Sequence, residues 1–467
     1  MLFPVAQLRF FLHRYKDMRK VCVPLSPGGE SRGVTSNPVC AMDATERQRI
    51  IELVQREVVP AIGCTEPIAV ALCVARATEL LGCRPEHIGV QLSANVLKNA
   101  MGVGIPGTGM IGLPIAIALG ALIGRSDYQL EVLRDCTPEA VEQGRAFIAE
   151  KRIDIALKAD TKEKLYIEVS CTAGTDTSRA VIAGGHTHFV RLEHGGEVLL
   201  NLQTDGGGEE QDEELELTLR KVYEFATTAP LDEIAFILQT ARLNKAAAEA
   251  SFQGDYGHGL GKMLRGNYEH RIMGDSIFSH ILSYTSGACD ARMAGAMIPV
   301  MSNSGSGNQG ISATMPVVIF AQESGKSEEE LARALMLSHL TAIYIKQSLG
   351  RLSALCGCVV AGTGSSCGIT YLMGGGYRQV SFAVKNMVAN LTGMICDGAK
   401  PSCALKVTSG VSTAVLSAIM AMEDRCVTSV EGIIDDDVDR TIRNLTRIGS
   451  QAMNETDRLV LEIMTKK

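Results

Sequence analysis

The chain has 467 residues, which is more than one ordinary hydrophobic core needs, so two lobes are expected. Hydrophobic residues make up 46%, charged residues 21%, and the formal net charge is −7. This balance is typical of a soluble globular protein and gives no basic surface for nucleic acid. Fourteen cysteines, with neither regular disulfide spacing nor a convincing signal peptide, indicate a reducing compartment. We therefore expect a cytoplasmic protein.

The first 41 residues differ in composition from the rest of the chain. They carry six Lys or Arg residues against two acidic residues, and they precede a natural start at Met42. We predict an unstructured N-terminal extension with no role in the fold; an organelle transit peptide is the alternative.

Residues 42–204 are predicted to form a mixed α/β lobe. Apolar residues recur at helical spacing over residues 44–60 and 138–151. Alternating or β-branched segments predict strands at residues 88–97, 154–157, 165–172, 178–182, 186–192 and 197–202, with a hairpin turn at Gly195-Gly196. His186 and His188 alternate on one predicted strand, but no third metal ligand follows nearby.

Residues 101–124 carry no charge and are long enough to cross a bilayer. Seven glycines and two prolines break this stretch into a loop and a helix of about twelve residues, which favours a buried core segment. We expect no membrane partner; a transporter with broken helices is the minority alternative.

The acidic, glycine-rich run at residues 205–214 predicts a linker. Residues 215–467 are then predicted to form a largely all-α, glycine-rich lobe. Helical periodicity is present at residues 215–229, 231–248, 256–265, 275–293, 327–348 and 435–465. The sequence as a whole predicts an α+β protein.

Candidate site residues in the first lobe lie within two short motifs. Cys64, in Gly-Cys-Thr-Glu-Pro, precedes a predicted helix whose N-terminus favours a thiolate, so it is either a reactive thiol or a metal ligand. Asn95, Lys98 and Asn99 lie before the glycine-rich loop. Lys98 is a candidate to hold a substrate carboxylate or to act as a base.

A second group of candidates lies in a glycine-, serine- and asparagine-rich loop of the helical lobe. Arg292 is suited to clamp a carboxylate, and a local salt bridge with Asp290 is the alternative. The polar side chains that follow suit an ammonium and a carboxylate group; they are Ser302, Asn303, Ser304 and Asn308.

Residues 351–406 hold five of the fourteen cysteines. Most buried cysteines are small apolar residues, and we assign Cys289 and Cys367 to packing. Cys356, Cys358, Cys396 and Cys403 instead lie next to glycine or proline, where turns allow several thiolates to converge. One cysteine, about forty residues and then a pair seven apart predicts an iron–sulfur cluster with three ligands.

Long motifs in a fixed order carry a family resemblance from about residue 45 to the end. They are GCTEP at residues 63–67, NVLKNAMGVGIPGTG at 95–109, DARMAGAMIPVMSNSGSGNQGI at 290–311 and the two cysteine segments. The chain resembles the iron–sulfur L-serine dehydratase alpha-chain superfamily, and within it most nearly the L-cysteine desulfidases.

The resemblance implies a [4Fe–4S] cluster held by Cys396, Cys403 and either Cys356 or Cys358. Cys64 would complete the ligand set or guard the open iron. The implied reaction is β-elimination of L-cysteine to sulfide, pyruvate and ammonia without pyridoxal phosphate. L-Serine dehydration and a non-catalytic redox sensor are the alternatives. We expect a small amino acid as ligand, and a homodimer is an open expectation.

Overall fold

The computed structural model describes residues 42–158, 161, 163–202, 215–350 and 352–466. The predicted extension at residues 1–41 and the predicted linker at residues 205–214 lie outside this part of the chain. All elements described below belong to one compact unit, Ala44–Lys467. The boundary between the two predicted lobes stays a prediction.

Six strands form one mixed sheet in the order β3-β2-β4-β5-β6-β7. The β2 and β3 strands are parallel and the other neighbours are antiparallel. The strands are β2 (His87–Leu92), β3 (Ile153–Leu157), β4 (Tyr166–Ala173), β5 (Asp176–Ala183), β6 (Phe189–His194) and β7 (Glu197–Asn201). Gly195 and Gly196 have positive φ angles and join β6 to β7, which confirms the predicted hairpin turn.

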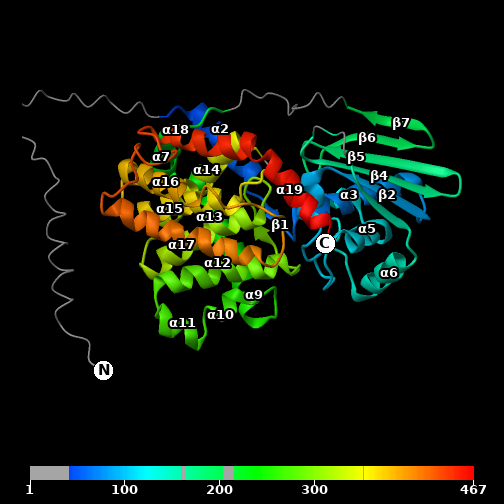
Figure 1. The fold of residues 1–467 in the computed structure, drawn as a ribbon, viewed down its shortest axis with the longest axis horizontal. Coiled ribbons are helices and arrows are strands. Elements are labelled where there is room, and N and C mark those ends of the chain that lie inside the picture. The colour runs from blue at the N-terminus through cyan, green and yellow to red at the C-terminus, as the bar shows by residue number, and fades with distance from the viewer. Residues whose placement is uncertain (1–41, 159–160, 162, 203–214, 351, 467) are drawn as a thin grey trace, which may run out of the picture. The chain divides into compact units, whose positions relative to one another are not determined.

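Helices cover one face of this sheet and place Cys64. Helix α3 (Thr65–Leu81) contacts β4 and β5, α5 (Leu113–Leu122) packs against α3, and α6 (Pro138–Ala149) packs against α5 (Figure 1). Alternate residues of β2 point into this core, where Ile88 and Leu92 are fully buried. The sheet thus fixes α3, and Cys64 is the residue that precedes it.

Most other elements are helices, which confirms the α+β class. They are α2 (Ala44–Glu57), α4 (Ala94–Ala100), η3 (Ser126–Glu131), α7 (Leu219–Thr228), α8 (Leu231–Ile234), η4 (Ala235–Ile237), α9 (Leu238–Gln253), α10 (Leu260–Met263), α11 (Asn267–Ile272), α12 (Ile277–Met293), α13 (Gly307–Glu323), α14 (Glu328–Leu349), α15 (Gly357–Leu372), α16 (Tyr377–Leu391), α17 (Cys403–Met422), α18 (Val438–Arg447), the π-helix η5 (Ile448–Ala452) and α19 (Asn454–Thr465).

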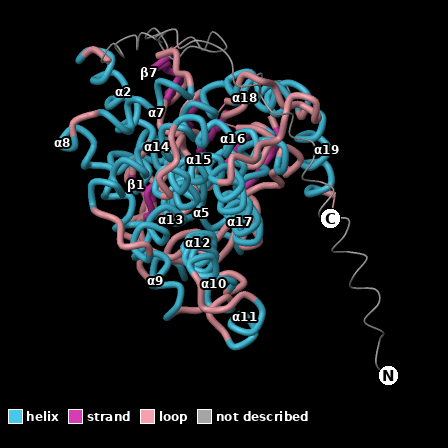
Figure 2. The backbone as a smooth tube through the Cα atoms, turned by 90° about the vertical axis from the view of Figure 1, so that its left-hand side faces the viewer, coloured by secondary structure: helices cyan, strands magenta, loops and turns pink. Residues whose placement is uncertain are grey.

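Helix α15 is the central helix of this region. It packs against α13, α14, α16 and α17, which surround it in Figure 2. A helix that is apolar on all sides is stable only inside a core. Its glycines allow close approach, because a Cβ atom at Gly364 would clash with the Ser338 carbonyl oxygen and one at Gly368 would lie 2.8 Å from Ala334 O.

Two early segments join the helical region. Helix α2 contacts α14, and the short strand β1 (Pro60–Ala61) pairs antiparallel with β8 (Val300–Met301). The Ser302 N–H donates to the Val59 carbonyl at 2.8 Å, and the Ser304 N–H donates to that of Glu57 at 2.9 Å. The approach to Cys64 is therefore hydrogen-bonded to the polar loop before α13.

Several local predictions were wrong. Residues 88–97 do not form one strand, because β2 ends at Leu92 and α4 follows, so Asn95, Lys98 and Asn99 lie on a helix. His186 and His188 lie in the turn before β6, not on a strand. Helices α13, α15 and α17 were not predicted, because their glycines and small residues hide the helical period.

Two apolar stretches bear on the membrane question. Residues 101–124 form a loop and the ten-residue helix α5, as predicted. Helix α17 is long and apolar enough to cross a membrane by length and composition, but half of that window is buried inside the protein. A buried core helix passes the same test, so α17 is weak support for a membrane span.

Candidate functional site

The two cysteine segments pair directly with each other. The Cys356 N–H donates to the Met394 carbonyl at 3.0 Å, and the Cys396 N–H donates to the Ala354 carbonyl at 2.6 Å. Between these bonds, Leu355 and Ile395 form an isolated β-bridge. Residues forty apart in sequence are therefore held side by side, and this brings Cys356 next to the segment of Cys396.

Two of these cysteines lie at helix N-termini. Cys356 is the N-cap of α15, and Cys403 is the first residue of α17. Free backbone N–H groups and the helix dipole favour an anionic sulfur at such positions. Cys64, Cys289, Cys356, Cys358 and Cys403 all belong to one small cluster of packed residues.

The connection from Cys396 to Cys403 is a tight turn held by ion pairs. Asp397 pairs with Lys400 at 2.7 Å and also with Lys406. Partial burial raises the pKa of Asp397, but the hydrogen bonds from both lysines outweigh it and lower this pKa to about 2. Gly398 has φ +90°, and a Cβ atom there would clash with the Lys98 carbonyl oxygen. This turn therefore requires glycine.

The four thiols of these segments ionise differently. The Cys358 thiol donates to Cys356 Sγ at 3.2 Å, and this hydrogen bond lowers the pKa of Cys356 to about 7 despite burial. The same contact raises the pKa of Cys358, while burial raises that of Cys396 and raises that of Cys403 to about 11. Cys356 is thus the first of the four to become a thiolate.

No three His, Cys, Asp or Glu side chains within the described ranges are already arranged to hold one metal ion. The cysteines nevertheless sense one another's charge: Cys403 is influenced by Cys356 and Cys396, and Cys358 by all three. The arrangement is a group of neighbouring thiols and not a closed single-ion site.

Cys64 faces a carboxylate that the sequence reading missed. Its thiol donates to Glu66 Oε2 at 2.9 Å, and Asn99 Nδ2 donates to Glu66 Oε1 at 2.9 Å. Burial and then the charge of Glu66 raise the pKa of Cys64, whereas the charge of Arg292 lowers it. The signal was the Glu in GCTEP, an acidic residue in the first turn of a buried helix. Cys64, Glu66 and Asn99 therefore form one hydrogen-bonded unit that lies within electrostatic reach of Arg292.

Arg292 lies at the end of α12 and faces the start of α13. Its Nη1 donates to Asn308 Oδ1 at 3.0 Å, and the Cys289 thiol contacts the same oxygen at 3.4 Å. Gly307 is required beside it, because a Cβ atom there would clash with Arg292 Nε. Asp290 instead accepts from the Gly261 N–H at 2.9 Å. Arg292 and Asn308 are thus brought together, and Cys289 lies beside them.

The remaining predicted contacts of this loop bind protein groups. Ser302 Oγ donates to the Val59 carbonyl at 2.7 Å, and Ser304 Oγ donates to Asn303 Oδ1 at 3.0 Å. Asn303 Nδ2 lies 3.1 Å from His339 Nδ1. These three side chains therefore stabilise the loop through hydrogen bonds to protein groups. Their direct role in ligand binding stays a prediction.

Comparison with known proteins identifies a family. The profile of the family described as serine dehydratase alpha chain matches residues 127–462. The chain belongs to this family. The match includes Arg292, Asn308 and the four clustered cysteines of residues 356–403 but not Cys64. Family membership supports a lyase of the serine dehydratase type.

Relatives that align over about 90% of this chain also cover much of the segment before residue 127. A UPF0597 protein of Bacteroides fragilis is 79% identical over 426 residues, which is 91% of this chain and 100% of the relative. A UPF0597 protein of Porphyromonas gingivalis is 55% identical over 432 residues (91% and 100%), and one of Shewanella pealeana is 46% identical over 425 residues (89% and 98%). These relatives are named without an activity.

Lys98 connects the cysteine turn of this serine-dehydratase-like protein to the C-terminal helix. Its side chain is 2% exposed, and its Nζ lies 2.5 Å from Asp457 Oδ1 on α19 and 3.3 Å from the Cys396 carbonyl. Its positive charge lowers the pKa of Cys396, against the larger effect of burial. Asn95 lies on the same helix and is also buried.

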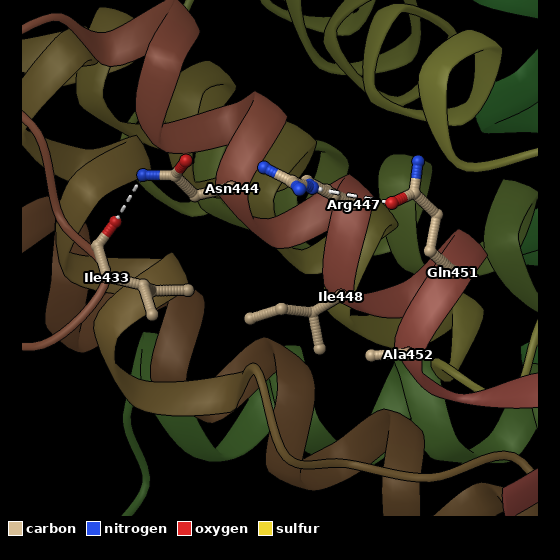
Figure 3. Close-up of a pocket in the computed structure, with 6 residues that line it drawn as sticks. All are labelled: Ile433, Asn444, Arg447, Ile448, Gln451 and Ala452. Carbon is tan, nitrogen blue, oxygen red and sulfur yellow. Dashed lines mark hydrogen bonds between the residues drawn. The ribbon is translucent and has the colours of Figure 1, made fainter. Parts of the chain in front are cut away.

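A surface pocket lies elsewhere in the helical region. It is lined by residues of α18 and η5 and of the segment before them: Ile433, Asn444, Arg447, Ile448, Gln451 and Ala452 (Figure 3). Asn444 and Arg447 are already hydrogen-bonded to Ile433 O and Gln451 Oε1. None of the predicted site residues lines this pocket.

Proposed function

We propose that this chain is an iron–sulfur-dependent L-cysteine desulfidase, which eliminates sulfide from L-cysteine and yields pyruvate and ammonia. The observation that carries the proposal is the pairing of the two cysteine segments beside Arg292 and the Cys64–Glu66 contact. Thiols from residues far apart in sequence meet there, next to groups suited to an amino acid. The elimination forms aminoacrylate, which water hydrolyses to pyruvate and ammonia.

The donor set fits a cluster with three protein ligands. Cysteine thiolates are the ligands that iron–sulfur clusters take, and each binds a different iron, so a ready-made single-ion geometry is not required. We propose Cys356, Cys396 and Cys403 as ligands. Between the two adjacent cysteines, Cys356 is favoured because its pKa is lowered and it caps α15, whereas Cys358 acts as its hydrogen-bond donor. The bound cluster would supply a Lewis acid that polarises the substrate.

The protein's own groups suit a zwitterionic substrate. Arg292 Nε, Asn99 Oδ1 and Gln309 Oε1 are buried polar atoms without a hydrogen-bond partner among the described residues. One is a donor for a carboxylate and two are acceptors for an ammonium group. Buried polar atoms are normally satisfied, so we propose that the substrate completes these bonds.

Cys64 and Lys98 have different roles in this proposal. Cys64 donates a hydrogen bond to Glu66, and Asn99 holds the carboxylate in place, so this pair can hold a proton close to the clustered cysteines. Lys98 Nζ is bound by Asp457 and by the Cys396 carbonyl. We therefore propose that Lys98 positions the cysteine turn instead of removing the α-proton.

The side chains packed around the clustered cysteines favour a substrate with a thiol over one with a hydroxyl. Met293, Met394, Val103 and Leu260 belong to the same packed cluster as the cysteines. Next to these side chains a substrate hydroxyl would lose its hydrogen bonds to water, whereas a thiol needs none. Hydrosulfide is also a better leaving group than hydroxide, because hydrogen sulfide is a much stronger acid than water.

The test is anaerobic purification, iron and sulfide counts, and then product assays with L-cysteine and with L-serine. We expect equal amounts of sulfide and pyruvate from L-cysteine and a much lower rate with L-serine. The matched variants lie on one helix: Cys356→Ala should abolish activity, and Cys367→Ala, in the buried middle of α15, should retain it. Activity on L-serine alone would make the protein a dehydratase. Iron binding without turnover of either amino acid would make it a sensor.

A further inference from the structure

A buried hydrogen-bond network runs from α14 to the start of α13. His339 is fully buried, and burial lowers its pKa to about 3, so the ring is neutral. Its Nε2 lies 2.9 Å from Thr314 Oγ1 and its Nδ1 lies 3.1 Å from Asn303 Nδ2. Thr314 Oγ1 donates to the Gly310 carbonyl at 2.7 Å, so it must accept from His339. The proton is therefore on Nε2, and Nδ1 accepts from Asn303.

This network determines which way the Asn303 amide faces. The His339 carbonyl can only accept, and it lies 3.1 Å from the same Asn303 nitrogen. That atom must be the NH₂ group, which leaves Oδ1 on the other side. There it accepts from Gln309 Nε2 at 2.9 Å and from Ser304 Oγ at 3.0 Å. All four hydrogen-bonding positions of the Asn303 amide are thus used.

The orientation of Gln309 follows by the same logic. Its NH₂ group must face Asn303 Oδ1, so its Oε1 faces away from the network. The side chain is 1% exposed, and Oε1 has no hydrogen-bond partner in the part of the chain that the structure describes. A Cβ atom on Gly357 would lie 3.0 Å from this oxygen. Oε1 therefore lies against the Cys356-Gly357-Cys358 turn.

This buried acceptor oxygen has no donor within the described residues, and buried acceptors are normally satisfied, so a bound ligand is the source that we consider. The three proposed ligands Cys356, Cys396 and Cys403 do not donate as iron-bound thiolates, and the Cys358 thiol already donates to Cys356. An α-ammonium group has three N–H donors and suits an acceptor that is held in a fixed direction. We propose that Gln309 Oε1 binds the α-ammonium group of the substrate, and that Asn303 and His339 are positioning residues that hold the oxygen in place. This inference rests on the proposed amino-acid substrate.

If Gln309 binds the ammonium group, its loss should weaken the binding only of ligands that carry this group. L-Alanine keeps the ammonium and carboxylate groups but has no leaving group, whereas 3-mercaptopropionate keeps the carboxylate and thiol but has no ammonium group. Gln309→Met preserves the size of the side chain and removes the acceptor. Calorimetry with the cluster-loaded protein should show L-alanine binding weakened about 10- to 100-fold, the range for a hydrogen bond to a charged group. Binding of 3-mercaptopropionate should be unchanged.

Two further variants distinguish positioning from general damage. Gln309→Glu keeps an acceptor oxygen, and its protonated carboxyl can donate to Asn303 Oδ1 in place of Nε2, so L-alanine should bind more tightly to this variant than to Gln309→Met. Asn303→Asp removes both N–H donors that fix this side chain against His339, so its oxygen no longer holds Gln309 Nε2 in one direction, and binding of L-alanine should weaken more than binding of 3-mercaptopropionate. Equal weakening of both ligands in the Met and Asp variants would overturn the inference, because it would show only structural damage.

The outcome for the unaltered protein separates the two proposals. If it binds L-alanine and releases sulfide from L-cysteine, while Gln309→Met leaves L-alanine binding unchanged, the inference is wrong and the proposed function stands. If it neither binds L-alanine nor turns over L-cysteine or L-serine, the proposed function fails and the inference with it.

Discussion

Two groups of cysteines can be compared within the described residues, one under the sheet and one at the paired segments. Cys73 on α3 donates to the Ala180 carbonyl at 3.3 Å, and Cys171 lies on β4. Burial raises the pKa of both, and that of Cys171 to about 12. At the paired segments, Cys356 is only partly buried, and a hydrogen bond from Cys358 lowers its pKa to about 7 against the effect of desolvation.

The difference shows that a hydrogen bond donated to the sulfur can outweigh desolvation. Inside regular helices and strands the backbone groups are paired with each other, so a thiolate there would find no donor. At a helix start the backbone N–H groups are free, and a second thiol or a lysine stands close enough to donate. A donor to the sulfur therefore distinguishes Cys356 from the packing cysteines, whereas a helix start alone does not, because the pKa of Cys403 is raised to about 11.

The largest effect that this comparison predicts is on iron content. Cys396→Ala removes a thiolate from the paired segments, so the anaerobically purified protein should lose most of its iron and more than about 100-fold of its L-cysteine activity. Cys171→Ala removes a cysteine sulfur from the sheet region, and this variant should keep both its iron and its activity. Iron and acid-labile sulfide per chain, with sulfide release, provide the measurement.

Similar iron content and activity in the two alanine variants would contradict the proposed difference between the two cysteine groups. Iron loss from Cys171→Ala would mean that the sheet region also contributes to the cluster or that the whole fold had become unstable. Thermal unfolding distinguishes these explanations, because Cys171→Ala is expected to be no more than about 2 kcal/mol less stable than the unaltered chain.

A second prediction concerns buried carboxylates in the same two regions. Asp457→Asn leaves Lys98 buried without its counter-charge, and removing one member of a buried ion pair costs about 3 kcal/mol. Because Lys98 also holds the Cys396 carbonyl, this variant should release iron faster to a chelator. Urea unfolding and the rate of iron release under anaerobic conditions measure the two effects.

Glu168→Gln is the matched control for Asp457→Asn. Glu168 on β4 is buried and pairs with Lys158 at 3.0 Å and with Arg179 at 2.6 Å, so its loss should also lower the free energy of unfolding. It lies in the sheet region, and iron release should therefore not change. Equal rates of iron release from both variants would show that general stability, and not the Lys98 contact, holds the cysteine turn.

Much of this arrangement could be predicted from sequence where the pattern is local. Alternation predicted the strands from residue 165 onward, and the GCTEP and cysteine motifs singled out Cys64, Cys356, Cys396 and Cys403. These signals work because strand period, turn glycines and the linear order of a motif are all read within a few residues. The same residues lie together in the structure.

The remaining features depend on contacts between distant residues. Helix α15 escaped prediction because glycine is a poor helix former, and only its packing against the backbone of α14 explains why Gly364 and Gly368 are there. Gln309 has no local signal either, since its orientation is set by His339 on a different helix. Residues 94–100 continued an alternating pattern, yet they form α4 and contact α19.

The smallest predicted effect is on pH dependence, at a buried group that no neighbouring charge stabilises. Burial lowers the pKa of His339 to about 3, below about 6.5 for an unfolded histidine. A depressed pKa means that the unfolded chain binds the proton first, so this stability is complete above about pH 6.5 and is lost as the pH falls toward 3. Between pH 6.5 and 5 we expect a loss of about 1.5 kcal/mol from this residue alone.

His339→Asn removes the titrating ring from the same place and provides the measurement. The variant should be less stable than the unaltered protein at pH 7, because the hydrogen bonds to Thr314 and Asn303 are altered. The difference between the two should shrink as the pH is lowered to 5 in anaerobic urea unfolding. A constant difference across this range would mean that His339 titrates normally and that water reaches the network. In that case the fixed orientation of Gln309 would lose its physical basis.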